Sequence, residues 1–308
     1  MRSSLSYPLI TLLLGTALLL LITAPGCQCK KDNTITPPPQ PEPPKDIYLV
    51  TAIRVNNVPK DSLVYNDQHQ VTERWDYNPS YRIWQSYIVY QYNQEGYLSI
   101  AKYYNENDNT VKSLSQKDSL VWKPAQLVTY TTFYRELGTE ISGYDTAYMQ
   151  ITPDRLLTLE GSTDTLVLDG IPAIAVIYRQ YRYQGKDVNQ FTDMNYFLVR
   201  YGSPNLTMSR FDLAYSQLNN PLFAQVAKNP NLFRAIVNDN YPFFSNEFYP
   251  YLISEHLVTN IRYESEQIAP KNCPVTYKMY DTTNFPQTQT IAGLNKTLSY
   301  TYKVIKAD

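Results

Sequence analysis

The sequence predicts a mainly β protein, an antiparallel meander that forms a curved sheet or a partly open barrel, with a small helical insertion near residues 203–256. Three observations predict this fold. Short segments alternate apolar and polar residues, as a half-buried strand requires. Twenty-nine tyrosines stand against ten glycines, and Tyr suits a half-buried pleated surface. Turn signals recur at roughly even spacing along much of the chain.

Residues 1–26 are interpreted as an export signal. A basic residue, Arg2, precedes an apolar run at 9–22 that is too short to span a bilayer comfortably. Ala24-Pro25-Gly26-Cys27 resembles the lipobox of bacterial lipoproteins, in which the peptidase cuts before the Cys and the Cys carries the acyl chains. The resemblance implies lipidation of Cys27 and, because Gln28 follows instead of Asp, the outer membrane. An ordinary signal-peptidase site or an uncleaved anchor is the alternative.

Residues 27–46 are predicted to be a tether. Six of the eight residues from Pro37 to Pro44 are proline, and such a run prefers polyproline II and cannot pair in a sheet. Cys29 lies in this tether, and a disulfide between Cys29 and Cys273 stays an open alternative in an oxidising compartment. The remaining residues, 47–308, are predicted to be one β-rich domain.

The clearest hairpin signal lies in residues 87–104. Ile88, Tyr90 and Tyr92 alternate with other residues before the turn NQEG at 93–96. Asn at the first position starts a type I turn, and Gly supplies the left-handed residue that closes a bulged hairpin. The frame is therefore Tyr, Asn or Asp, two free positions, Gly, one free position and an aliphatic residue.

This frame recurs imperfectly. Its first positions, 65, 92, 122 and 151, are 27, 30 and 29 residues apart, which predicts about two strands and two turns per unit. His69, Arg155 and Asn284 take the place that Gly96 holds in the clearest copy. We therefore predict that His69 has a positive φ and points to solvent.

The frame is similar to the YD repeats of Rhs-type proteins. Together with the lipobox, the chain resembles uncharacterised lipoproteins of Gram-negative envelopes that carry a Tyr-rich antiparallel meander. The resemblance covers residues 61–159 and 273–304, and only Tyr92–Leu98 matches the YD frame fully. It implies a β-hairpin domain and carries over no activity.

The pattern changes after residue 203. Phe211, Ala214, Tyr215, Leu218 and Leu222 fall on one helical face, and Asn-Pro pairs at 220 and 229 are typical of helix starts, which predicts two or three short helices within 209–238. An aromatic loop follows, either as a lid on the sheet core or as an exposed contact surface. The predicted contact residues are Tyr241, Phe243, Phe244, Phe248, Tyr249 and Tyr251.

The sequence points to no catalytic residue, cofactor or metal site. His69 is explained by its turn, and His256 stands alone between a loop and a strand, where a structural role is the commoner one. No G-x-S-x-G, phosphate loop or Cys/His cluster is present. Paired carboxylates of a glycosidase remain open, with Asp145, Asp164 and Asp169 as uninformative candidates. Trp75, Trp84 and Trp122 are expected to pack between strands or to cover the sheet, with a sugar platform as the alternative.

A formal net charge of −1 gives no electrostatic reason to bind nucleic acid. The sequence therefore favours a lipid-anchored envelope protein that is a non-enzymatic scaffold or binding module. Its predicted partners are the membrane, through Cys27, and an envelope protein or a glycan. The alternative is a lipid-anchored, glycan-directed hydrolase with paired carboxylates.

Overall fold

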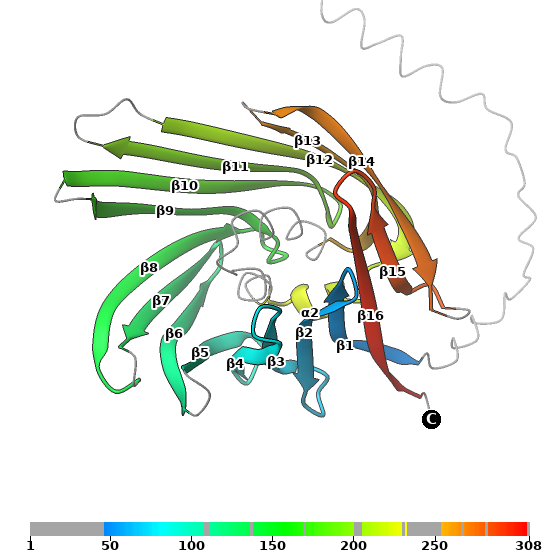
Figure 1. Cartoon of the computed structure of the whole chain (residues 1–308), viewed down its shortest axis with the longest axis horizontal. Helices are drawn as coiled ribbons and strands as arrows, with labels where there is room; N and C mark the ends of the chain where they lie inside the picture. Colours follow the sequence, from blue (N-terminus) through cyan, green and yellow to red (C-terminus); the bar gives the residue numbers. More distant parts are fainter. Residues whose placement is uncertain are drawn as a thin grey trace, which may run out of the picture. The chain divides into compact units, whose positions relative to one another are not determined.

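The computed structural model describes residues 46–306, apart from 108–110, 136–137, 169–170, 200–204, 230–231, 233–253, 266–267 and 281–282. These residues form sixteen strands and a short helix (Figure 1). The elements are β1 (Ile47–Val55), β2 (Val58–Tyr65), β3 (Val71–Asn78), β4 (Ile83–Tyr92), β5 (Leu98–Asn107), β6 (Val111–Lys123), β7 (Gln126–Tyr134), β8 (Ile141–Ile151), β9 (Leu157–Leu168), β10 (Ile171–Gln184), β11 (Asp187–Val199), β12 (Asn205–Asn219), α2 (Phe223–Val226), β13 (His256–Ser265), β14 (Ile268–Met279), β15 (Pro286–Ile291) and β16 (Lys296–Ile305).

The strands form one closed antiparallel barrel in which every strand pairs with its neighbours in sequence. The predicted antiparallel meander is confirmed. The sequence predicted a curved sheet or a partly open barrel, whereas the barrel is closed. Its first strand, β1, pairs with its last, β16, from Ile47 opposite Ile305 to Val55 opposite Leu298. Closure gives the backbone groups of the first and last strands partners that open edges would lack.

The prediction of helices within 209–238 is wrong for its first part. Residues 205–219 form β12, on which Phe211 and Leu213 are buried, whereas their neighbours Asp212 and Ala214 are not. The segment is apolar at both spacings, with Ala214 and Leu218 on the helical face and Leu213 on the strand face, and pairing of β12 with β11 and β13 selects the strand. The described helix is the four-residue α2, and the Asn220 side chain accepts the Leu222 N–H just before it.

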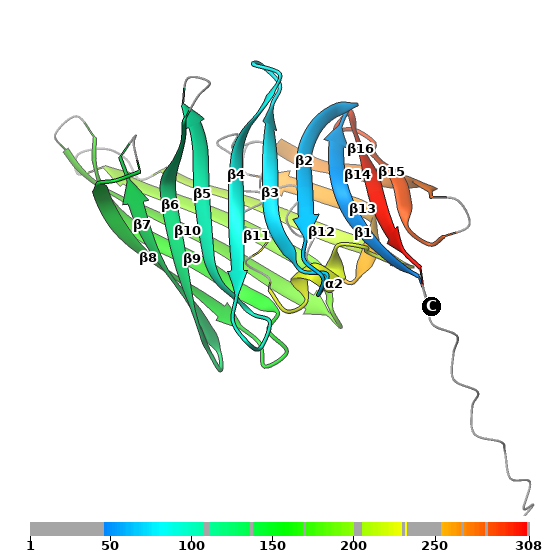
Figure 2. The same cartoon turned by 90° about the horizontal axis from the view of Figure 1, so that it is seen from below.

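An apolar core lies inside the barrel at the end where even-numbered strands finish. Leu98, Leu127 and Phe191 are completely buried, and the α2 residue Val226 belongs to the same cluster. Figure 2 shows α2 near the ends of β2, β3 and β4. Beside α2, the Asn229 side chain accepts the Leu98 N–H at 2.6 Å, which ties the segment after α2 to the start of β5.

Aromatic side chains at the ends of even-numbered strands bond back to the first residues of the preceding strand. Tyr92 at the end of β4, for example, donates its hydroxyl to the Val71 carbonyl at 2.6 Å. We call these residues the brace tyrosines: Tyr65, Tyr92, Tyr183, Tyr215, Tyr277 and Tyr302. Trp122 on β6 makes the same contact through its indole N–H to the Leu98 carbonyl. The braces fasten neighbouring hairpins to one another at this end of the barrel, except at β8, which ends at Ile151.

The first positions of the frame lie at strand ends: positions 65, 92 and 151 end β2, β4 and β8, and position 122 is the last residue but one of β6. His69 and Arg155 have positive φ values of 60° and 65°, as the frame predicts, although His69 is only half-exposed. Asn284 does not have a positive φ. The Tyr280 N–H there bonds to the Phe285 carbonyl, in a loop one residue longer than the Asn93–Tyr97 loop.

Candidate functional site

A layer of charged and polar side chains lines the inner wall next to the apolar core. On β2 and β3, Arg74 Nε donates to Asp61 Oδ1 at 2.6 Å, and both side chains are about as buried as the core, at 3% and 6% exposure. Attraction to Asp61 and to Asp76, 3.7 Å away, raises the pKa of Arg74 against the lowering effect of burial. The guanidinium is therefore held as a cation inside the barrel.

Asp118 on β6 is the centre of a second inner-wall cluster. Its carboxylate accepts hydrogen bonds from the Tyr103 hydroxyl at 2.9 Å, the Gln116 amide at 2.8 Å and the Thr131 hydroxyl at 2.8 Å. Three donors therefore occupy its two oxygens. Asp118 is also 6% exposed. The arrangement suits a structural carboxylate.

One of the three predicted carboxylate candidates, Asp145, lies in line with the inner-wall residue Asp118. Asp145 on β8 lies opposite Thr131, which in turn lies opposite Asp118, so the two acids flank β7 in one cross-strand row. Two strand spacings put their Cα atoms about 10 Å apart. In a glycosidase the two carboxyl groups lie about 5–9.5 Å apart and open to the substrate, whereas Asp118 is buried and already bonded to three donors. Asp164 lies on β9 opposite Ala175, and Asp169 is outside the described residues.

The opposite wall holds a similar buried cluster. Arg179 on β10 lies between Glu160 on β9, at 3.5 Å, and Asp193 on β11, at 3.4 Å. The Tyr181 hydroxyl donates to Glu160 at 3.4 Å. Both carboxylates are about 95% buried, so this cluster holds three neighbouring strands together and is not open to a substrate.

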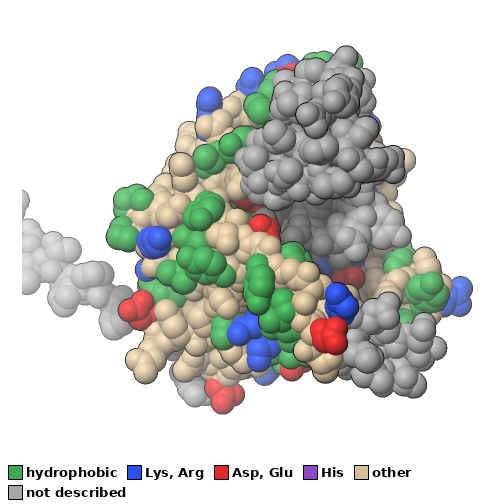
Figure 3. All heavy atoms as spheres, turned by 90° about the vertical axis from the view of Figure 1, so that its left-hand side faces the viewer, with side chains coloured by type: hydrophobic (Ala, Val, Ile, Leu, Met, Phe, Trp, Pro, Cys, Tyr) green, Lys and Arg blue, Asp and Glu red, His purple; other side chains and the backbone are tan. Residues whose placement is uncertain are grey.

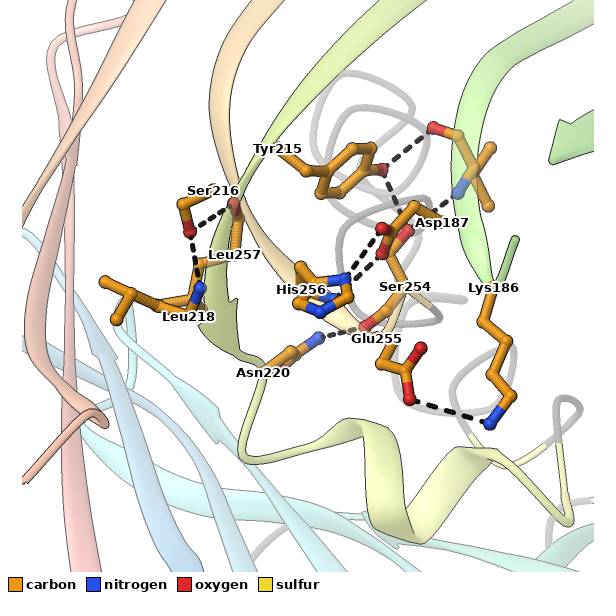
Figure 4. A network of polar contacts seen from close by, with 11 residues as sticks. Lys186, Asp187, Tyr215, Ser216, Leu218, Asn220, Ser254, Glu255, His256 and Leu257 are labelled. Carbon is orange, nitrogen blue, oxygen red and sulfur yellow. Dashed lines mark hydrogen bonds and ion pairs between the residues drawn. The ribbon is translucent and has the colours of Figure 1, made fainter. Parts of the chain in front are cut away.

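His256 belongs to a polar network at the braced end of the barrel (Figure 4). Its Nδ1 lies 2.8 Å from Asp187 Oδ2, and its backbone N–H donates to Asp187 Oδ1 at 2.9 Å. Ser254 is fully buried, and its hydroxyl contacts the Tyr215 hydroxyl at 2.8 Å and the Val188 N–H at 3.1 Å.

A Ser, a His and an Asp thus share this network without forming a hydrolase site, because the buried Ser254 hydroxyl is closed to a substrate. The network ties the chain before β13 to the turn between β10 and β11. The structural interpretation of His256 is supported. Its partner Asp187 is 69 residues away and has no local signal in the sequence.

The three Trp residues pack on the sheet, as expected. Trp75 stacks on Tyr87 with ring centroids 4.6 Å apart, and Trp122 makes the brace contact described above. Trp84 meets Tyr77 edge-on and is 37% exposed.

Several predicted residues lie outside the part of the chain that the structure describes. They are Cys27, Cys29 and the predicted aromatic contact surface (Tyr241, Phe243, Phe244, Phe248, Tyr249 and Tyr251). Cys273, the proposed partner of Cys29, is 1% exposed and belongs to the core. Within the described ranges, no group of three or more His, Cys, Asp or Glu side chains is arranged to hold a metal ion. No helix in the same part of the chain is long and apolar enough to cross a membrane.

Comparison with known proteins finds only distant likeness. No family model matches the sequence, and no curated protein gives a significant match. Similar solved structures include a porin-like protein from Bacteroides vulgatus, with a TM-score of 0.34 and 12% identity over 82% of this chain and 98% of that one. Another is a porin-like protein from Bacteroides uniformis, with a TM-score of 0.29 and 11% identity over 82% and 96% of the two chains.

Proposed function

We propose that this chain is a lipid-anchored outer-membrane protein whose barrel stands in water beside the bilayer and works as a non-enzymatic binding module. The observation that carries the proposal is the polarity of the barrel wall. A membrane-spanning barrel turns an apolar band about 25 Å tall toward lipid and keeps a polar interior. This barrel instead has an apolar core inside, next to the buried ionic clusters of the inner wall, and charged side chains on its outer wall.

Charged side chains lie along the outer wall, within strands as well as at their ends. Lys102 on β5 faces Lys117 on β6, and their chain neighbours Ala101 and Asp118 point inward and are buried. Arg210 and Arg262, on β12 and β13, have side chains 45% and 50% exposed. The hydrophobic patches on the face drawn in Figure 3 are likewise interrupted by charged side chains.

The cost of placing this wall in lipid favours an aqueous location. Each Lys or Arg on the lipid face at the bilayer midplane costs about 2–4 kcal/mol. An acyl anchor on Cys27 supplies membrane attachment without that cost, because each buried CH₂ contributes about 0.8 kcal/mol and several chains act together. Gln28 after Cys27 supports the outer membrane as the destination.

Cell fractionation of an anchor variant tests the proposal. The variant combines Cys27→Ala with a conventional cleavable leader in place of residues 1–26, so that export continues without lipidation. We expect the wild type in the membrane pellet and the variant almost entirely in the soluble periplasmic fraction, because the barrel itself has no affinity for lipid. Cys29→Ala is the matched control and should stay in the pellet. An exported variant that remains folded in the pellet would contradict the proposal.

A further inference from the structure

An uncharged strip lies on the outer wall along β9. Tyr148 on β8 lies opposite Gly161 on β9, which lies opposite Tyr178 on β10. In the next outward row, Leu159 lies opposite both Gln150 and Gln180. The β9 strip is therefore Tyr148, Gln150, Leu159, Gly161, Tyr178 and Gln180. The residues between these rows, Met149, Glu160 and Arg179, belong to the inner wall described above.

The two tyrosines stand on either side of a residue without a side chain. Tyr148 is 55% exposed and Tyr178 is 42% exposed, which is high for aromatic residues in the middle of a sheet. Two strand spacings separate their Cα atoms by about 10 Å. Gly161 leaves backbone at the floor between the rings. The pairing of β8 with β9 runs from Tyr148 opposite Gly161 to Ile151 opposite Leu157, so the strip lies where these two strands are joined.

Two exposed amides continue the strip along the strand direction. Gln150 and Gln180 flank Leu159, and each amide offers both donors and an acceptor. None of the six residues of the β9 strip carries a charge. Charged side chains begin beside it, with Arg182 as the next outward residue on β10, and continue on the outer walls of β12 and β13. A neutral strip of this composition has no electrostatic attraction for a nucleic acid or an acidic polymer.

We propose that the β9 strip binds a neutral saccharide chain that lies along β9. Apolar faces of its sugar rings would rest against Tyr148 and Tyr178 over Gly161, and its hydroxyl groups would bond to the Gln150 and Gln180 amides. Exposed Tyr rings suit this task because each presents an apolar body with a polar tip. The inference rests on the proposed function, since it needs an outer wall in water, and it names the ligand class of the binding module.

Affinity electrophoresis of the full-length lipoprotein in mild detergent tests the site. The native gels contain amylopectin, galactomannan, xyloglucan or mixed-linkage β-glucan, with polygalacturonate as an anionic control. We expect at least one neutral polysaccharide to retard the wild type. Tyr148→Ala or Tyr178→Ala should weaken that affinity about tenfold or more, as loss of an aromatic anchor does.

Gly161→Thr separates binding from folding. Gly161 does not have a positive φ, and a β-branched residue suits a strand, so the variant should keep its unfolding midpoint while filling the gap and abolishing retardation. Tyr144→Ala is the matched control, since Tyr144 is 75% exposed on β8 outside the strip, and should bind as the wild type does. Any of three results would overturn the inference. They are a wild type that none of the neutral polysaccharides retards, strip variants that bind as the wild type does, and equal retardation of the protein by polygalacturonate. The cell fractionation test of the anchor variant does not depend on any of these three outcomes, so the two proposals can fail separately.

Discussion

Replacing Arg74 with Ala should lower the free energy of unfolding by about 3–5 kcal/mol. The substitution removes the guanidinium whose Nε lies 2.6 Å from Asp61 Oδ1. The Asp61 side chain, which is 6% exposed, has then lost this cation. The penalty of an uncompensated buried charge exceeds the net worth of the pair itself. Urea unfolding, followed by circular dichroism, measures the change.

A surface ion pair of this protein provides the matched control. Arg135 lies 3.5 Å from Glu140, but both side chains are more than 70% exposed. Arg135→Ala should therefore cost less than about 1 kcal/mol, because solvent screens an exposed pair. Equal losses in the two Arg variants would mean that the inner-wall cluster is open to water.

Raising the pH above 10 should unfold the barrel cooperatively. Burial raises the pKa of all six brace tyrosines well above the ordinary value of 10.0. The folded state then keeps protons that the unfolded state releases. Stability is fully present below pH 10.0 and falls as the pH rises further, by about 1.4 kcal/mol per pH unit for each tyrosine that stays protonated.

Together the six brace tyrosines would lower the free energy of unfolding by about 8 kcal/mol for each pH unit above 10. That is comparable to the entire free energy of unfolding of a typical protein, about 5–15 kcal/mol. Tyrosinate absorbance and circular dichroism, recorded on one pH series, should change together in a steep step. Tyr92→Phe is the control: burial also raises the pKa of Tyr90 and Tyr300, so one tyrosine fewer among eight makes the loss of stability with pH shallower by about an eighth. Gradual ionisation of all tyrosines with the barrel intact would contradict the brace assignment.

The hairpin repeat was predictable because its determinants are local. The turn at residues 93–96 needs only Asn at its start and Gly at its end, and the left-handed His69 and Arg155 follow from the same frame. The hydroxyl contacts of the brace tyrosines were not predicted, although an aromatic residue at the first position of the frame was the signal for them.

Features that depend on distant pairing were beyond the sequence. Closure rests on β1 meeting β16, with about 250 residues between them. The β12 segment offered an apolar face at helical spacing, and only its two neighbouring strands make it a strand. The same holds for the candidate sites, since Asp118 and His256 acquire their partners from other strands.

Spin labelling of the outer wall tests most directly whether the barrel stands in water. Cysteines introduced at Thr276 on β14 and Thr301 on β16 occupy exposed outward positions, in a Cys29→Ser, Cys273→Ala background with Cys27 left for lipidation. The labelled lipoprotein is reconstituted into vesicles, and its relaxation by a water-soluble nickel complex is compared with relaxation by oxygen. We predict strong relaxation by the nickel complex at both positions, as for a label in water. Strong relaxation by oxygen with little effect of the nickel complex would place this wall in lipid and contradict the account.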